Sequence, residues 1–516
     1  MPNRWVVLVL VGVAQLMVVL DATIVNIALP SAQGALHFST SDREWIVTAY
    51  ALAFGSLLLL GGKLGDLFGR KWTFIVGLCG FAVVSGIGGL SQSFVMLVSA
   101  RALQGVFGAL LAPSALGLLT VTFAGSSDRA KAFGIFGAIA GGGASVGLVL
   151  GGALTQFLSW RWCLYVNLVI AVPTAAVAVR LMVNQANPKR TRIDLPGLLT
   201  ATAGLFALVY GFSSAQTHSW TATQTIVALV ASPVLLITFV VIESRVEHPL
   251  LPLRVLRSRS RADAYLSVLF ASAGVFSVFF FLTYYMQQAL GFSPLITGVA
   301  FLPMTAVLVT TSVTAQTRVL PRTGAKPLVM GGMALGVIAM LIFTGLTPGG
   351  SYATHLLPGL LLVGVGMGSV VAPAIATATL GVEADETGVA SAMVNTSQQV
   401  GGAVGLALLS TISASAATHY AVVHPRLPGV VAVAAVHGYT TGFAVAAGIF
   451  AVGFVLALLI LPAKAGAHKC TLRTALARGI TYAHHIEAVG RLGNQSGQVG
   501  SEHLGVEPRP PDNGHR

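Results

Sequence analysis

The stretch WVVLVLVGVAQLMVVL, residues Trp5–Leu20, contains a single polar side chain, that of Gln15. A second run near the other end of the chain, Phe443–Leu461, is apolar throughout. The strands of a membrane barrel alternate apolar and polar residues, and neither run does so. In lipid every backbone polar group has to be satisfied within the chain, so continuous runs of this kind predict transmembrane helices.

The composition of the whole chain supports the same fold class. Of its 516 residues, 55% are hydrophobic and only 9% are charged, and the mean hydropathy is +0.83. A soluble protein carries about a quarter of its residues as charged side chains. We therefore expect an all-α integral membrane protein whose surface contacts the lipid bilayer. The net charge of +13 does not indicate a nucleic-acid partner, because basic residues gather in the cytoplasmic loops of membrane proteins.

The apolar runs predict fourteen transmembrane helices, since a span needs roughly 20 residues to cross about 30 Å of hydrocarbon. The spans fall into groups of six, two and six. Their centres lie near Val18, Ala53, Gly80, Ala109, Gly142, Val172, Ala203, Ser232, Phe276, Leu308, Ala334, Val365, Gly402 and Gly448. The predicted domains are a six-helix bundle over 1–186, two linker spans over 187–246, a second six-helix bundle over 247–464 and a disordered tail over 465–516.

Lysine and arginine residues predict the orientation of these spans. About 25 of the 29 Lys and Arg fall in every second loop and in the termini, and the exceptions are chiefly Arg43, Arg161 and Arg426. Loops with this excess face the cytoplasm. An even number of spans then places both termini in the cytoplasm of a protein embedded in the cell (inner or plasma) membrane.

The loop after the second span, Gly62–Lys71, reads GKLGDLFGRK. Its glycines predict a tight turn that brings two helices close together. Asp66 can lie near a positive helix N-terminus, while Arg70 and Lys71 can contact lipid head groups. An ordinary basic loop is the alternative. The spacing resembles the G-x-L-x-D-x-x-G-R-K signature of the major facilitator superfamily, which implies a cytoplasmic gate formed by Gly62, Asp66, Gly69, Arg70 and Lys71.

A degraded copy of this loop, LPRTGAK, occupies Leu320–Lys326. Its glycine and lysine, Gly324 and Lys326, align with the Gly69 and Lys71 of the first loop, and a proline replaces the aspartate. The repeat predicts two related halves, as in many transporters.

The first span contains LDATIVNIALP at Leu20–Pro30, which resembles the first-span signature of the fourteen-span drug:proton antiporter family. Asp21 is the only acid that we place inside the hydrocarbon, where an aspartate costs about 2.5–3.5 kcal/mol. Burial favours its protonated form, so Asp21 is a candidate proton-binding residue. A helix-packing hydrogen bond without a role in transport is the alternative. Asn26 lies on a different strip of the helix and is assigned to the cavity or to packing.

The fourth span carries Arg101, Gln104, Gly105 and Gly108 on one helix face. This resembles the R-x-x-Q-G motif of the superfamily, in which a buried arginine is thought to assist proton transfer. An arginine that extends to the membrane interface is the alternative.

The fifth span has glycines at every fourth position, Gly143, Gly147 and Gly151, which predict a ridge for close helix contact. With Gly152, the segment is similar to the G-P-x-x-G-G antiporter motif of the drug exporters. Leu148 stands where proline is usual, so the resemblance implies the packing surface without the expected kink.

The resemblance covers about residues 5–462. It implies two bundles that rock around a central cavity and export amphipathic drugs or antibiotics in exchange for protons, with Asp21 and Arg101 coupling the proton. Two alternatives are a proton-coupled carrier of one metabolite, such as a self-made antibiotic or a siderophore, and a membrane sensor without transport. The aromatic residues of Phe279–Tyr285 can hold a cationic drug. The acidic loop of Glu383, Asp385 and Glu386 predicts either a solvated helix cap or a contact to the loop around Arg70.

No enzymatic activity, cofactor or metal site is predicted. The chain lacks the G-x-x-x-x-G-K-[ST] loop of ATPases. Gly143-x-Ser145-x-Gly147 matches the hydrolase elbow pattern, but it lies inside an apolar span rather than between a strand and a helix.

Overall fold

The computed structural model describes residues 4–460, apart from 40–41, 124–127, 183–193, 248, 252, 257 and 380–386. The chain divides into two compact units, Met1–Pro462 and Ala463–Arg516, and all described residues belong to the first. The predicted tail and the acidic loop around Asp385 therefore lie outside the described residues.

Every described regular element is helical, which confirms the predicted fold class. The first helices are α1 (Arg4–Leu36), α2 (Trp45–Phe68), α3 (Arg70–Gly89), α4 (Phe94–Thr122), α5 (Arg129–Phe157) and α6 (Trp162–Leu181). Two helices follow, α7 (Leu195–Thr217) and α8 (Thr223–Glu243). The remainder are α9 (Leu253–Leu256), α10 (Arg259–Tyr284), α11 (Pro294–Ala300), α12 (Leu302–Thr314), α13 (Leu320–Thr323), α14 (Ala325–Phe343), α15 (Leu357–Thr379), α16 (Thr387–Val423) and α17 (Val430–Ile460).

Three π-helical turns interrupt the later helices, at Tyr285–Ala289, Ala315–Val319 and Tyr352–Leu356. With these turns included, each predicted span centre lies within a helix. Thirteen helices of the described chain are long and apolar enough to cross a membrane. In α5 the apolar stretch that can be assigned is shorter, Gly143–Phe157.

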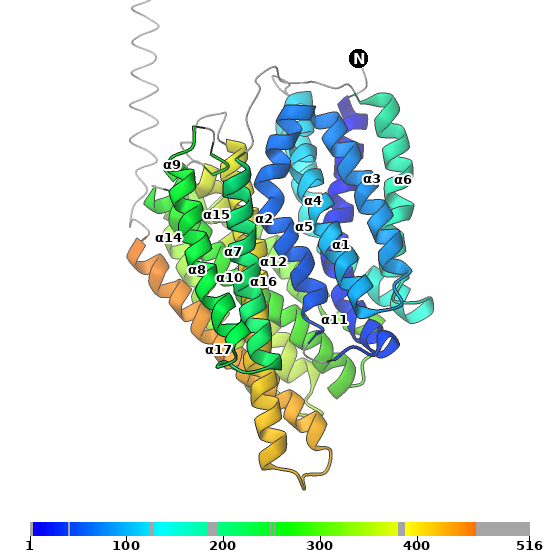
Figure 1. The fold of residues 1–516 in the computed structure, drawn as a ribbon, viewed down its shortest axis with the longest axis vertical. Coiled ribbons are helices and arrows are strands. Elements are labelled where there is room, and N and C mark those ends of the chain that lie inside the picture. Colours follow the sequence, from blue (N-terminus) through cyan, green and yellow to red (C-terminus); the bar gives the residue numbers. More distant parts are fainter. Residues whose placement is uncertain are drawn as a thin grey trace, which may run out of the picture. The chain divides into compact units, whose positions relative to one another are not determined.

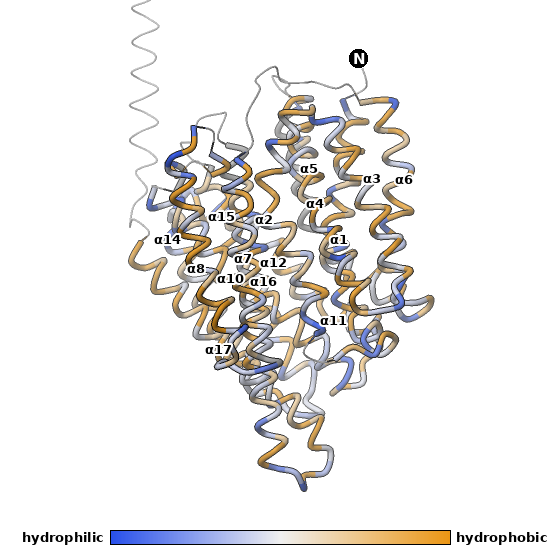
Figure 2. Tube along the Cα trace, viewed as in Figure 1, coloured by the Kyte–Doolittle hydropathy of each residue, from blue (hydrophilic) through white to orange (hydrophobic). Residues whose placement is uncertain are grey.

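The surface of α8 shows why these helices need lipid. Val227, Val230, Val234 and Ile237 recur at helical spacing, and more than half of each side chain is exposed. In water such a stripe would be a large apolar patch, whereas lipid tails solvate it. Figure 2 shows the same pattern, with hydrophobic residues along the helix shafts and hydrophilic ones gathered toward their ends.

Helix packing repeats itself along the chain. α1 packs on α5 and α6, and α4 packs on α2 and α3. In the same relative positions, α10 packs on α16 and α17, and α15 packs on α12 and α14. We propose that these two sets are the two related bundles (Figure 1). Between them, α7 contacts both α2 and α16, while α8 packs chiefly on α7.

The two ends of the helices differ in charge. We call the end that carries the loop Lys63–Lys71 the basic end, and the other end the opposite end. At the opposite end the two sets touch: Gln287 Nε2 donates to the carbonyl of Ile27 at 3.0 Å, and the Leu295 amide donates to Gln156 Oε1 at 3.3 Å. The hairpin that joins α16 to α17 projects beyond the other connections there (Figure 1).

Candidate functional site

Asp21 lies at the centre of a buried polar cluster in the first set of helices. Its side chain, on α1, is 0% exposed. Arg101 Nη1 on α4 donates to Asp21 Oδ2 at 2.6 Å, and Asn167 Nδ2 on α6 donates to Oδ1 at 2.7 Å. Gln104 Nε2 donates to the same oxygen, Oδ1, at 3.2 Å. Three helices therefore meet at one carboxylate, an arrangement that suits its ionised form.

Arg101 is enclosed rather than extended to a membrane interface, since only 1% of the residue is exposed. Its Nε donates to the carbonyl of Ile46 at 3.1 Å, and its Nη1 also donates to Gln104 Oε1 at 2.9 Å. The guanidinium carbon lies 4.4 Å from the ring centroid of Tyr50. Tyr50 and Ile46 both belong to α2, so Arg101 connects α2 to the aspartate on α1.

Two members of this cluster were not predicted from the sequence. Gln104 Nε2 donates to Ser85 Oγ at 2.6 Å, and Asn167 is fully buried beside Asp21. Each is a polar side chain inside a largely apolar span, α3 for Ser85 and α6 for Asn167. A lone amide in a transmembrane span is costly unless it has a partner, and that signal could have identified Asn167.

The glycines of α4 let it approach α2 closely enough for this contact. A Cβ at Gly105 would lie 2.5 Å from the carbonyl oxygen of Tyr50 and 2.9 Å from the amide nitrogen of Phe54. A Cβ at Gly108 would lie 2.9 Å from the Phe54 ring. All three distances are shorter than real Cβ contacts, so the helix face that carries Arg101 also requires these glycines.

The glycine ridge of α5 packs against α1. A Cβ at Gly147 would meet the backbone of Leu20 at 3.0 Å, and one at Gly151 would meet the side chain of Ile24 at 2.8 Å. Gly152 instead faces the second set, where a Cβ would lie 2.6 Å from the backbone of Leu295. Leu148 is fully buried, and α5 runs through it as one helix.

Asn26 does not join the Asp21 cluster. Its Nδ2 donates to the carbonyl of Ala22, one turn earlier on α1, at 3.1 Å. The side chain is nearly buried, so in this conformation it serves the packing of α1.

The loop at the basic end is more helical than the glycines predicted. Residues Gly62–Phe68 continue α2, and only Gly69, with φ 89°, breaks the helix before α3 begins. The predicted tight turn is therefore confined to one residue. Arg70 Nη1 donates to the carbonyl of Gly117 on α4 at 2.8 Å, so it contacts protein. The side chain of Asp66 lies outside the described part of the structure.

The degraded copy of this loop has the same local structure. Gly324 separates α13 from α14 with φ 80°. Lys71 Nζ donates to the carbonyl of Val179 at 2.9 Å, and Lys326 Nζ donates to the carbonyl of Leu458 at 2.8 Å. Both acceptors lie in the last turn of their helices, α6 and α17. The repeated glycine and lysine thus occupy equivalent places.

Besides Asp21, two further acids, Asp263 and Glu243, are buried near the ends of the described helices. Asp263, near the start of α10, is fully buried and accepts a hydrogen bond from Ser267 Oγ at 3.3 Å. Glu243, at the end of α8, accepts the amides of Leu250 and Leu251 at 3.2 and 3.1 Å. Both acids lie close to the ends of their helices, where the number of apolar residues in the sequence does not predict whether a side chain is buried.

Two rings of the aromatic segment Phe279–Tyr285 already contact a cation, and that cation belongs to the protein. The guanidinium carbon of Arg43, at the opposite end, lies 4.1 Å from the ring centroid of Tyr284 and 5.2 Å from that of Phe280. Tyr439 on α17 adds a third ring at 5.8 Å. Arg43 is one of the few basic residues outside the predicted cytoplasmic loops. This unusual position in the sequence could have indicated that its side chain contacts protein.

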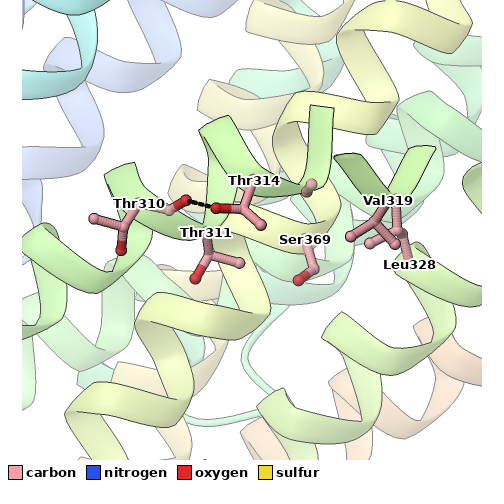
Figure 3. A pocket seen from close by; sticks show the side chains of 7 residues that line it. Thr310, Thr311, Thr314, Val319, Leu328 and Ser369 are labelled. Carbon is pink, nitrogen blue, oxygen red and sulfur yellow. Dashed lines mark hydrogen bonds between the residues drawn. The ribbon is translucent and has the colours of Figure 1, made fainter. Parts of the chain in front are cut away.

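A small groove lies among α12, α14 and α15, and Figure 3 shows the side chains that line it. Its cavity volume is about 240 Å³, and its polar lining comes from Thr310, Thr311, Thr314 and Ser369. Ligand pockets for drug-sized molecules usually measure about 300–1,000 Å³. We therefore assign no substrate to this groove.

The chain is similar to known proteins over most of its length. Residues 11–406 match the family model described as Major Facilitator Superfamily. The chain is 45% identical over 466 residues to a puromycin resistance protein of Streptomyces alboniger, covering 90% of this chain and 92% of the relative. It is 38% identical over 414 residues to a cephamycin export protein of Amycolatopsis lactamdurans, covering 79% and 85%.

A solved structure supports the fold alone. It is the inward-facing, occupied form of a bacterial homologue of the human lysosomal transporter Spinster, with a TM-score of 0.63 and 14% identity. The match covers 89% of this chain and 97% of that one.

Proposed function

The chain belongs to the major facilitator superfamily, and we propose that it exports small-molecule antibiotics from the cell in exchange for protons. Family membership makes it a multi-pass membrane transporter rather than an enzyme, as the sequence predicts. The names of its relatives favour an antibiotic over a siderophore as the transported substrate, because one is a puromycin resistance protein and the other a cephamycin export protein. This observation carries the proposal.

The proton-coupling step of the proposal rests on the buried pair of Asp21 and Arg101. A proton on Asp21 would remove the charge that Arg101 neutralises, while Arg101 would keep its bonds to Gln104 and to the carbonyl of Ile46. Protonation would thereby loosen α1 from α4 and α2. Because removing one partner of a buried ion pair costs about 3–5 kcal/mol, neutralising this carboxylate is a large enough perturbation to shift a conformational equilibrium.

Proton entry supplies enough free energy for export without ATP. A membrane potential of 100 mV provides about 2.3 kcal/mol for each proton, equivalent to a roughly 50-fold gradient of a neutral substrate. In the proposed orientation the basic end and both termini face the cytoplasm, and the opposite end faces the outside.

The experiment uses inverted membrane vesicles that contain the full chain, with puromycin as the first substrate. An inward-acidic gradient should drive puromycin into wild-type vesicles, and Asp21→Asn should reduce this accumulation to the level of empty vesicles. Asp128→Asn makes the same exchange at a part-exposed aspartate that pairs with Arg4 at 2.7 Å, and it should transport at the wild-type rate. If Asp21→Asn keeps the wild-type rate, Asp21 is structural.

A further inference from the structure

Arg43 and Glu44 are neighbours in the connection from α1 to α2, at the opposite end, and both are buried. Arg43 enters the aromatic rings of α10 and α17 described above. Glu44 contacts different helices, since the hydroxyls of Ser213 on α7 and Ser410 on α16 face its carboxyl group. Two consecutive residues of the first set therefore reach into the second set and into the extra helix α7.

Glu44 is enclosed by the surrounding helices. The residue is 1% exposed, and within the described part of the chain neither carboxyl oxygen completes a hydrogen bond. Immediately beside it, Trp45 Nε1 donates to Ser213 Oγ at 2.7 Å, and Thr411 Oγ1 on α16 donates to the carbonyl of Phe212 at 2.9 Å. These bonds hold α2, α7 and α16 together around the acid, so water has little access in this conformation.

The charges around Glu44 do not compensate for this burial. Burial raises the pKa of Glu44, which precedes the span beginning at Trp45, from 4.5 to about 8. The charged groups that act on it are Arg43, which lowers the pKa, and Asp42, which raises it, and both belong to the same connection. From α7 and α16 the facing groups are the Ser213 and Ser410 hydroxyls, which do not titrate in this range.

We propose that Glu44 is a second proton-binding site, and that its neutral form holds the opposite end of the transporter closed. A neutral carboxylic acid can remain among α2, α7 and α16 without a countercharge, whereas a carboxylate there favours separation of the helices and entry of water. Opening would also withdraw Arg43 from its three aromatic rings, because the two residues are adjacent. The site would take a proton from the opposite side of the membrane.

The site has a direct connection to Asp21. Glu44 precedes Ile46 by two residues, and the carbonyl of Ile46 accepts the hydrogen bond from Arg101 Nε. Movement of the start of α2 would therefore alter the contacts of the arginine that pairs with Asp21. In the proposed exchange cycle, substrate release at the open end would be followed by protonation of Glu44, closure, and return to the conformation seen here. Of this proposal, only the position of Glu44 protonation in the transport cycle rests on the proposed function.

The sign of the pH dependence follows from linkage. Between about pH 4.5 and 8 the closed state binds the proton on Glu44, whereas a hydrated Glu44 in the open state does not. Lowering the pH through this window therefore stabilises the closed state. The ratio of open to closed molecules should increase by up to about tenfold for each unit by which the pH rises through this window. Below and above the window the ratio should be constant.

The test measures conformation rather than transport. Spin labels at Gln92→Cys and Thr347→Cys, two exposed positions at the opposite end in the first and second sets, report the separation of the sets in nanodiscs. In a background without the native cysteines, the wild-type distance distribution should shift toward separation as the pH rises. Glu44→Gln should stay closed at every pH. Glu247→Gln, the same exchange at an exposed glutamate of the basic end, should titrate like the wild type.

Asp21→Asn separates this proposal from the proposed function. If Asp21→Asn retains the pH-dependent shift and Glu44→Gln loses it, Glu44 binds the proton that closes this end, whether or not transport is proton-coupled. If Glu44→Gln retains the wild-type titration, the proposal is overturned. Glu44→Met, neutral and similar in size, replaces the glutamine variant if that variant does not assemble, and its titration is judged in the same way.

Discussion

The first and second helix sets share a packing scheme and differ in what lies at their centres. α1–α6 enclose a hydrogen-bonded ion pair, Asp21 with Arg101. In the second set, the corresponding interior is aromatic, with the ring centroids of Phe343 and Phe443 5.1 Å apart and those of Phe281 and Phe443 5.6 Å apart. The three π-helical turns also lie in this second part. The two sets thus share a glycine and a lysine at the basic end, whereas the residues inside their spans differ: an ion pair in the first set and aromatic rings in the second.

The largest expected effect comes from breaking the ion pair of the first set. Arg101→Met should lower the free energy of unfolding by about 3–5 kcal/mol, because it leaves Asp21 buried and without its countercharge. Thermal unfolding in detergent measures the loss. The double variant Asp21→Asn with Arg101→Met should recover most of it, since no uncompensated charge remains. Equal stability of the single and double variants would show that the two residues do not act as a pair.

Gly69 separates α2 from α3, and Gly324 separates α13 from α14, so these two glycines allow a matched test of the equivalence of the two loops. Gly69→Ala and Gly324→Ala should each destabilise the protein by about 1–3 kcal/mol, because both glycines have positive φ angles that alanine rarely adopts. Around Gly324 a Cβ would meet open space, so the cost there is one of backbone conformation. The same unfolding assay applies. A loss confined to one of the two variants would contradict the equivalence of the two loops.

A smaller effect is expected from the two lysines. Lys71→Met and Lys326→Met should each cost about 0.5–1 kcal/mol, since each removes one exposed hydrogen bond to a terminal helix carbonyl. Hydrogen exchange at the last turns of α6 and α17 is the most direct readout, and each variant should increase exchange only in the turn that it contacts. Unchanged exchange in both turns would show that the paired bonds do not hold these helix ends.

Sequence patterns predicted the fold well because lipid imposes a simple rule on it. Each apolar run has to be a helix, so the centres near Val18 and Gly448, and all those between, lie in helices. The helical continuation through Gly62–Phe68 was missed because glycine suggests a turn, although contact with α4 stabilises a helix there.

The candidate site was predictable only in part. Motif resemblance placed Asp21 in the first span and Arg101 and Gln104 in the fourth, but their meeting with Asn167 depends on how three helices, α1, α4 and α6, pack. Glu44 was overlooked because it precedes the apolar run of α2 and reads as a loop acid. Its burial comes from α7 and α16, which are distant in sequence.

The hairpin between α16 and α17 has a practical consequence. A 37-residue helix such as α16 is about 55 Å long, whereas the hydrocarbon is about 30 Å thick. The exposed connection between α16 and α17, His424–Gly429, is thus a suitable insertion point for a small rigid protein or an epitope. Such a fusion would give a detergent-solubilised particle of 53.1 kDa a visible landmark for electron microscopy. Antibody staining of intact cells through the same epitope would establish which side of the membrane the hairpin faces.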